Sequence, residues 1–221
     1  IFERSSVSSL FSFLTTQLKS IIPEKELGLL PHGCARIGHI IIVHLKPPLW
    51  PYRQAIGQAL LSFFPLQRTV ALKIGPTLDP LRLPRLEVIA GDPQTETLHK
   101  ELGCSFKLDP LRITFSAGNH FERKRMIEVV QPGETIVDMF ACVGNLSLPL
   151  CVHNKTVSCI GIEFNPLAYR YLQENIRLNK IEDRYHAIFG DNRKVTPQDL
   201  ADRVLLGYWG VDSQQLLVAL H

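Results

Sequence analysis

In the second half of the chain, short apolar runs rich in β-branched residues alternate with amphipathic stretches at helical spacing. This alternation is typical of a parallel sheet with crossover helices. We therefore predict a Rossmann-like α/β domain, in which ligands bind at the carboxyl ends of the strands. The predicted strands are 135–140, 158–163, 186–190 and 203–207, and the predicted helices are 121–130, one that starts at Ser147, and 166–179.

The first half has a different pattern, with fewer helices and with strands separated by proline-rich loops. We predict a small α+β domain here, followed by the Rossmann-like domain, with the boundary between residues 1–111 and 112–221. The predicted elements up to residue 115 are a helical region within 1–30, a helix at 52–64, and strands at 37–45, 69–74, 86–91 and 112–115.

Composition limits the class of protein. The 221 residues are 45% hydrophobic and 20% charged, which suits a globular protein in water. No apolar run approaches the ~20 residues that a membrane helix needs. The five cysteines include no C-x-x-C pair, so we expect neither a disulfide framework nor a zinc site, and we expect a reducing cytoplasm. Residues 1–110 hold 12 Lys and Arg against 9 Asp and Glu, an excess that favours an RNA-facing surface there.

Polar groups follow three of the predicted strands. They are the small-residue loop 138–144, the acid Glu163, and the pair Asp191-Asn192. An acid about 20 residues after a glycine loop can bind ribose hydroxyls, and a carboxylate with an amide can bind an adenine ring. Each has a simpler interpretation, a solvated strand-end acid for Glu163 and a turn for Asp191-Asn192. Together they predict an adenosine ligand.

The loop 138–144 contains a single glycine, Gly144, rather than the G-x-G-x-x-G of dinucleotide sites. An adenosine ligand without a pyrophosphate, such as S-adenosylmethionine, therefore fits better than NAD. Cys142 stands where such loops usually carry a glycine. We expect that position 142 needs only a small side chain, because Gly144 can take the tight turn.

Residues 115–119, F-S-A-G-N, come just before a basic helix. Ser116 could hydrogen-bond an amino-acid group, and Arg123 could meet a carboxylate. The alternative is a helix cap followed by a solvated Arg-Lys-Arg face, which composition alone favours. We also expect Asn165 to cap the helix that starts at Pro166.

Several stretches resemble the tRNA guanine-37 N1-methyltransferase superfamily: residues 87–109, V-D-M-F-A-x-V-G (137–144), I-E-F-N-P (162–166) and Y-L-Q-E-N-I-R-L-N-K (171–180). Three further signatures are similar to its wybutosine-pathway branch, the tRNA aminocarboxypropyltransferases. They are F-S-x-G-N-x-x-E-[KR]-x-R (115–125), G-D-N-R (190–193) and A-D-R-V-x-L-G (201–207). The methyltransferase branch usually carries F-S-P-R and N-L-P at the first and last of these places.

The resemblance implies S-adenosyl-L-methionine as cofactor, no metal, and the anticodon loop of tRNA-Phe as partner. A modified guanosine at position 37 would attack the γ-carbon of the methionyl group and release methylthioadenosine. Full members have further strands, and this chain begins at Ile1, so we expect a fragment with a C-terminally incomplete sheet. The implied cofactor-binding residues are Ser116 and Arg123 at the methionine end, Phe140 and Ala141 in the loop, Glu163 at the ribose, and Asp191 and Asn192 at the adenine. The sequence identifies no catalytic base.

Three other functions stay open at this point. The first is guanine-37 methylation itself. The second is RNA uracil-5-methylation, because C-V-G-N-L-S-L-P-L also resembles that family. That reaction needs a cysteine beyond the third strand, and no cysteine follows Cys159. The third is a degenerate tRNA- or cofactor-binding protein without turnover.

Overall fold

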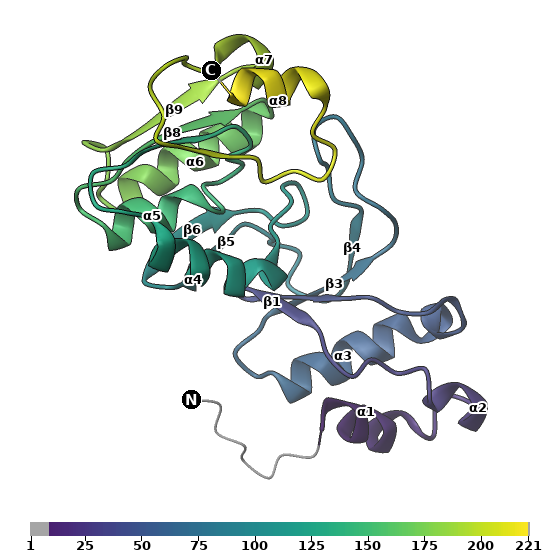
Figure 1. Cartoon of the computed structure of the whole chain (residues 1–221). Helices are drawn as coiled ribbons and strands as arrows, with labels where there is room; N and C mark the ends of the chain where they lie inside the picture. The colour runs from purple at the N-terminus through teal and green to yellow at the C-terminus, as the bar shows by residue number, and fades with distance from the viewer. Residues whose placement is uncertain (1–8, 221) are drawn as a thin grey trace. The chain divides into compact units, whose positions relative to one another are not determined.

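The computed structural model describes residues 9–220, which form two compact units (Figure 1). The first unit holds the described residues up to 78, together with 83–97 and 110–112. The second holds residues 79–82, 98–109 and 113 onward. Two short segments before residue 112 thus pack with the second unit. The division into two domains with one boundary between residues 111 and 112 stays a prediction.

The first unit is a four-stranded sheet in the order β1-β2-β3-β4, in which only β2 and β3 are parallel. Buried leucines of the first helix and of the third pack on it, as the predicted α+β pattern requires. The helix predicted at 52–64 and the strands at 69–74 and 86–91 are confirmed. The elements are α1 (Leu10–Leu18), α2 (Glu24–Leu27), β1 (Ala35–Ile37), β2 (Ile40–Val43), η1 (Pro47–Tyr52), α3 (Arg53–Phe63), β3 (Thr69–Lys73) and β4 (Leu86–Gly91).

Two predictions for the first unit need correction, and a third is only partly covered. The strand predicted over 37–45 is a hairpin, because Gly38 adopts φ 54° and reverses the chain between β1 and β2. The strand predicted over 112–115 is wrong: Ile113 donates its N–H to the carbonyl of Asp109 in a turn. The helical region predicted within 1–30 is α1 and α2, while residues 1–8 lie outside the described residues.

The second unit is built on a parallel sheet in the order β10-β7-β8-β9. The first strand in sequence, β7, lies between β8 and β10, so the strand order reverses beside it. This is the switch point at which α/β folds bind ligands. The predicted Rossmann-like α/β fold is confirmed. The elements are β5 (Thr97–Glu101), β6 (Cys104–Leu108), η2 (Ala117–Asn119), α4 (His120–Val129), β7 (Thr135–Asp138), α5 (Ser147–His153), β8 (Ser158–Glu163), α6 (Pro166–Leu178), β9 (Tyr185–Phe189), α7 (Asn192–Val195), β10 (Arg203–Leu205) and α8 (Ser213–Ala219).

Helices cover both faces of this sheet, because alternate side chains of each strand point to opposite faces. On one face, Val137 and Ile162 pack with apolar side chains of α7 and α8, including Val195 and Val218. Helices α5 and α6 pack on β8, and α6 also packs on β9; both helices contact β6 of the separate two-stranded sheet β5–β6 (Figure 1). The result is a three-layer arrangement with the strand ends free to hold a ligand.

Two asparagines of α6 fix the β5–β6 hairpin to this layer. Asn175, which is fully buried, accepts the N–H of Lys107 (2.7 Å) and donates to the carbonyls of Lys107 (3.2 Å) and Val143 (3.0 Å). Asn179 pairs in the same way with the backbone of Ser105. The motif Y-L-Q-E-N-I-R-L-N-K thus has a structural role, since its two amides satisfy backbone groups of β6 and of the loop after β7.

Candidate cofactor site

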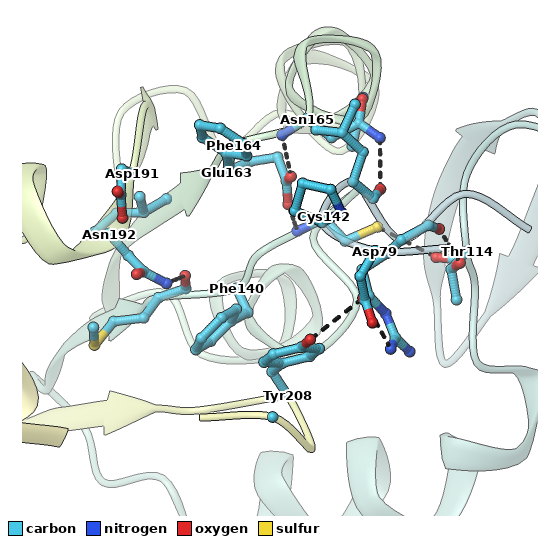
Figure 2. Close-up of a pocket in the computed structure, with 18 of the residues that line it drawn as sticks. Asp79, Thr114, Phe140, Cys142, Glu163, Phe164, Asn165, Asp191, Asn192 and Tyr208 are labelled. Atoms are coloured by element: carbon cyan, nitrogen blue, oxygen red, sulfur yellow. Dashed lines mark hydrogen bonds and ion pairs between the residues drawn. The ribbon is translucent and has the colours of Figure 1, made fainter. Parts of the chain in front are cut away.

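A cavity of about 400 Å³ opens at the carboxyl edge of the parallel sheet (Figure 2). The last residue of β8, Glu163, and the segments that follow β7, β9 and β10 all contribute to its wall, the latter through Phe140, Asp191 and Tyr208 respectively. All of the lining residues belong to the second unit. This is the place where the strand order predicts a ligand, and the volume is within the range of small-molecule sites.

The loop after β7 is anchored from below by Asp138. Its carboxylate accepts the N–H of Phe140 (3.1 Å) and the hydroxyl of Ser147 (2.7 Å), and Ser147 also hydrogen-bonds the hydroxyl of Tyr185 (2.7 Å). Complete burial raises the pKa of Asp138 to about 6, although these hydrogen bonds act in the opposite direction. Asp138 lies beneath the cavity wall, where it fixes the loop.

Cys142 adopts a left-handed backbone conformation with φ 53°, so the expectation that this position needs only a small side chain is wrong. Gly144 is left-handed as well, with φ 91°, and therefore does not relieve Cys142. The Cys142 N–H donates to Oε2 of Glu163 (2.7 Å), and its thiol donates to the carbonyl of Thr114 (3.3 Å). The bond to Glu163 requires the backbone to turn here, which explains why glycine suits this position.

This conformation predicts an inverted order of stability for two variants at position 142. At ordinary positions alanine is more stable than glycine by about 0.4–1 kcal/mol. At a left-handed position an L side chain costs roughly 1–2 kcal/mol, so Cys142→Gly is expected to be more stable than Cys142→Ala by about 1 kcal/mol. Both variants lack the thiol, and urea unfolding of the pair measures the backbone effect alone. A more stable alanine variant would contradict the observed φ.

Glu163 ends β8 with both carboxylate oxygens directed by backbone donors. Oε2 accepts the N–H of Cys142 (2.7 Å), and Oε1 accepts the N–H of Asn165 (2.6 Å). Burial raises the pKa of Glu163, while the two N–H groups lower it. A carboxylate has about four acceptor sites, so each oxygen can accept one further hydrogen bond from a ligand in the cavity.

Asn165 caps α6, as the sequence predicted. Its Oδ1 accepts the N–H groups of Leu167 (3.0 Å) and Ala168 (3.4 Å). Its Nδ2 donates to the carbonyl of Leu81 (3.0 Å), a residue far away in the sequence. The cap therefore also ties the segment 79–82 to the cavity wall.

Asp191 and Asn192 both line the cavity, but their side chains already have partners. Asp191 forms a bidentate ion pair with Arg193 (both distances 2.9 Å) and caps α7. Asn192 donates to the carbonyl of Met139 (2.7 Å) and accepts from Gln215 (3.1 Å). Asn192 thus joins the loop after β7 to α8 and shapes this end of the cavity.

Of the seven residues that the sequence singled out, the structure brings five to the cavity wall: Ser116, Phe140, Glu163, Asp191 and Asn192. Arg123 and Ala141 do not line it, and both side chains are fully buried. Arg123 pairs bidentately with Glu101 (3.0 and 2.9 Å) and donates twice to the carbonyl of Ser116 (both 3.1 Å). Arg123 thus fixes the backbone of Ser116, which does line the cavity.

The Glu101 carboxylate is the centre of this buried network. His120 approaches one oxygen at 2.6 Å and His99 the other at 3.2 Å. Burial by itself would raise the pKa of Glu101, but the hydrogen bond from His99, the charge of Arg123 and the bond from His120 together lower it to about 2. Glu101 is therefore ionised at neutral pH and compensates the buried charge of Arg123.

Sequence reasoning missed other parts of the cavity wall, chiefly the segment Asp79–Arg82 and Gln215 of α8. The first lies in a proline-punctuated loop among first-unit elements, so nothing local connected it with the sheet. Gln215 could have been found from the sequence, because Asp212 and Gln215 have the spacing of a capping box, which marks the start of α8. Among residues 9–220 there is no helix long and apolar enough to cross a membrane and no cluster of three potential metal ligands.

Comparison with known proteins gives the chain its family. The sequence model of the TRM5/TYW2 methyltransferase domain matches residues 97–220, and that of the TYW2 N-terminal domain matches residues 14–95. The chain belongs to the TRM5/TYW2 methyltransferase family. The predicted resemblance to the superfamily is therefore confirmed, and the first match covers all of the cavity wall from Ile113 onward.

Two curated relatives carry the same name, tRNA(Phe) (4-demethylwyosine(37)-C(7)) aminocarboxypropyltransferase. The relative from Pyrococcus horikoshii is 40% identical over 191 residues, which is 86% of this chain and 67% of the relative. The relative from Methanocaldococcus jannaschii is 47% identical over 127 residues, which is 58% of this chain and 50% of the relative. The chain thus spans between half and about two thirds of their lengths.

A solved structure agrees with these relatives. The crystal structure of P. horikoshii TYW2 in complex with MeSAdo superimposes with a TM-score of 0.73 at 38% sequence identity. The match covers 88% of this chain and 69% of that chain. The two proteins therefore share their fold over most of this chain.

Proposed function

We propose that this protein transfers the 3-amino-3-carboxypropyl group of S-adenosyl-L-methionine to the modified guanosine at position 37 of tRNA-Phe, in wybutosine biosynthesis. The observation that carries the proposal is the match of the chain's first part to the TYW2 N-terminal domain, together with two relatives named as aminocarboxypropyltransferases. Since the chain spans 67% and 50% of their lengths, the activity, the substrate and the partner are all part of the proposal.

The residues of the cavity suit a cationic nucleoside. Its wall carries four carboxylates and two guanidinium groups, an excess of two negative charges. S-adenosylmethionine has a positive sulfonium and a positive ammonium, which such a wall attracts. A pyrophosphate would be repelled by the same wall, in agreement with the single glycine of the loop. The charged residues are Asp79, Glu163, Asp191, Asp212, Arg82 and Arg193.

Within this wall, we assign Glu163 to the ribose, because each of its oxygens can accept a hydroxyl in addition to one backbone N–H. We assign Asp191 and Asn192 to the adenine end, and Phe140 and Ser116, which also line the cavity, to the remainder of the cofactor. Arg123 and Ala141 act from behind the wall, Arg123 through the carbonyl of Ser116 and Ala141 through its N–H bond to the carbonyl of Ile162 (3.0 Å).

When bound, the cofactor supplies an electrophilic γ-carbon: a nucleophilic carbon of the base bonds to it, the Cγ–S bond breaks, methylthioadenosine leaves and the base loses a proton. A sulfonium has three electrophilic carbons, so the geometry of binding selects the one that reacts. The methyltransferase branch usually has Pro-Arg where this chain has Ala117-Gly118. These two residues open η2, directly after Ser116, and a side chain at Gly118 would meet open space.

The proposed partner is the anticodon loop of tRNA-Phe, which presents position 37. A tRNA substrate agrees with the names of both relatives. The excess of basic residues in the first half of the chain suits contact with phosphates. We also propose that the protein acts in the cytoplasm, since all five cysteines are free thiols.

Nucleoside mass spectrometry tests this function against its rivals. The protein is incubated with S-adenosylmethionine and with tRNA-Phe that carries either guanosine or 4-demethylwyosine at position 37. We expect an aminocarboxypropyl gain on the 4-demethylwyosine substrate only. A methyl gain on the guanosine substrate would assign guanine-37 methylation instead. No gain on either substrate, with no cofactor binding by calorimetry, would identify a protein without turnover.

A further inference from the structure

We propose that Asp79 and Arg82 form the subsite for the amino-acid end of the cofactor, with Arg82 on the α-carboxylate and Asp79 on the α-ammonium. The inference rests on the proposed function, because it assigns the residues that hold the group to be transferred. Both side chains line the cavity, and neither belongs to the sequence motifs that predicted the site.

The segment 79–82 is fixed to the wall by its backbone. The Leu81 carbonyl accepts Nδ2 of Asn165 (3.0 Å), and the Arg82 carbonyl accepts the hydroxyl of Thr114 (2.6 Å). Asn165 also caps α6 and donates its N–H to Glu163. The segment is thus attached to the same short stretch of chain that positions the ribose-binding carboxylate.

Arg82 adopts a left-handed backbone conformation with φ 57°. This conformation is uncommon for a residue other than glycine and persists only where the surroundings hold it in place. Such positions gather at ligand clamps and active sites. Here the bond to Thr114 holds the backbone, and the strained turn directs the guanidinium to the cavity rather than away from it.

Both charged groups are accessible to a ligand, and Oδ1 of Asp79 also accepts the hydroxyl of Tyr208 (3.3 Å). The Asp79 side chain is 61% exposed and that of Arg82 is 41% exposed. The closest approach of their charged atoms is 3.8 Å, which exceeds hydrogen-bond distance. The Arg82 guanidinium lies 5.2 Å from the ring centre of Tyr208, and that ring packs on Phe140 at 5.1 Å. An α-amino acid carries an ammonium and a carboxylate on one carbon, so it needs an acid and a cation side by side.

The location agrees with the binding of the rest of the cofactor. In Figure 2, Asp191 and Asn192 lie on one side of the cavity, Asp79 and Tyr208 lie on the other, and Glu163 is between them. With the ribose on Glu163 and the adenine towards Asp191, the substituents of the sulfonium extend towards Asp79 and Arg82. Two charged contacts at the end of the chain restrict its rotation and therefore the direction of the γ-carbon.

Isothermal titration with two ligands tests the assignment. S-adenosylmethionine carries the amino-acid group, whereas 5′-methylthioadenosine has the adenosine and the sulfur but lacks that group. We expect Arg82→Gln and Asp79→Asn each to raise the Kd for S-adenosylmethionine roughly 10- to 100-fold, as loss of a hydrogen bond between charged groups predicts. The Kd for 5′-methylthioadenosine should stay unchanged, which also shows that each variant is folded.

Arg85→Gln is the matched control, because Arg85 is an exposed arginine close by in the same loop and does not line the cavity. It should change neither affinity. An equal loss for both ligands in Arg82→Gln and Asp79→Asn, or no loss for S-adenosylmethionine, would overturn the subsite while the function stands. A wild-type protein with no affinity for either ligand would overturn the proposed function, and the subsite with it.

Discussion

The Arg123→Met variant is expected to lose roughly 3–5 kcal/mol of unfolding free energy, as measured by urea denaturation at pH 7. The Arg123 side chain is fully buried, and that of Glu101 is only 9% exposed. Removal of the guanidinium leaves this carboxylate without its bidentate partner and removes the two bonds from Arg123 to the carbonyl of Ser116, which keeps the N–H of Asn119 (3.1 Å) as a donor. It also removes the group that lies 5.0 Å from the ring centre of Phe115.

A double variant, Arg123→Met with Glu101→Met, is the control. It removes both charges together, so it should be more stable than Arg123→Met alone, since a buried ion pair can be replaced by apolar residues at little cost. If the double variant were the less stable of the two, the loss would come from packing and not from an unpaired carboxylate.

The pH dependence provides a second measure of the same network. The pKa of Glu101 is lowered from 4.5 to about 2, so its stabilisation is present above pH 4.5 and is lost as the pH falls towards 2. Asp138 has a pKa raised from 3.8 to about 6, so its stabilisation is present below pH 3.8 and is lost as the pH rises towards 6. In Glu101→Gln only the contribution of Glu101 is missing. We therefore expect the unfolding free energy of the wild type to fall more steeply than that of Glu101→Gln as the pH decreases from 4.5 towards 2.

The Glu163→Gln variant is expected to raise the Kd for S-adenosylmethionine by about 100-fold or more, since hydrogen bonds to a charged group contribute ~1.5–3 kcal/mol each. The carboxylate accepts two backbone N–H groups at 2.7 and 2.6 Å. A glutamine amide can accept only one of them and places its own N–H₂ against the other. The variant therefore loses both the charge that we propose to bind the ribose and the hydrogen bond that shapes the loop at Cys142.

Calorimetry of the variant needs a control for a general effect of charge. Glu182→Gln removes an exposed carboxylate in the turn before β9 and should leave the affinity as it is. Thermal unfolding separates a loss of folding from a loss of binding. Unchanged affinity in folded Glu163→Gln would show that the ribose is held elsewhere.

The sequence predicted much of the second unit because its pattern is local. The apolar run 158–163 is the strand β8 to the residue, and Asn165 with Pro166 starts α6 as its cap chemistry requires. Glu163 lines the cavity because the end of a parallel strand determines its position. In these cases the local structure is determined by interactions between residues that are close in the sequence.

The failures have a common cause, which is that contacts between distant segments decide the outcome. The β5–β6 hairpin turns at Leu102-Gly103, where Leu102 adopts φ 48°, and a leucine is not a residue typical of such a turn. The strand expected at 112–115 has no partner strand, and its apolar residues Ile113 and Phe115 are buried by other contacts. Arg123 was expected at the methionine end of the cofactor, yet its guanidinium pairs with Glu101, 22 positions earlier in the sequence, and its side chain does not line the cavity.

We propose that the 3-amino-3-carboxypropyl group of S-adenosylmethionine, and not its methyl group, moves to the tRNA. Two preparations of S-adenosylmethionine test it directly, one labelled in the methyl carbon and one labelled in the carboxyl carbon. Each is incubated with the protein and tRNA-Phe bearing 4-demethylwyosine, and the label in the recovered tRNA is counted. We predict that the carboxyl label is retained and that the methyl label is absent from the tRNA. Retention of the methyl label without the carboxyl label would contradict the account.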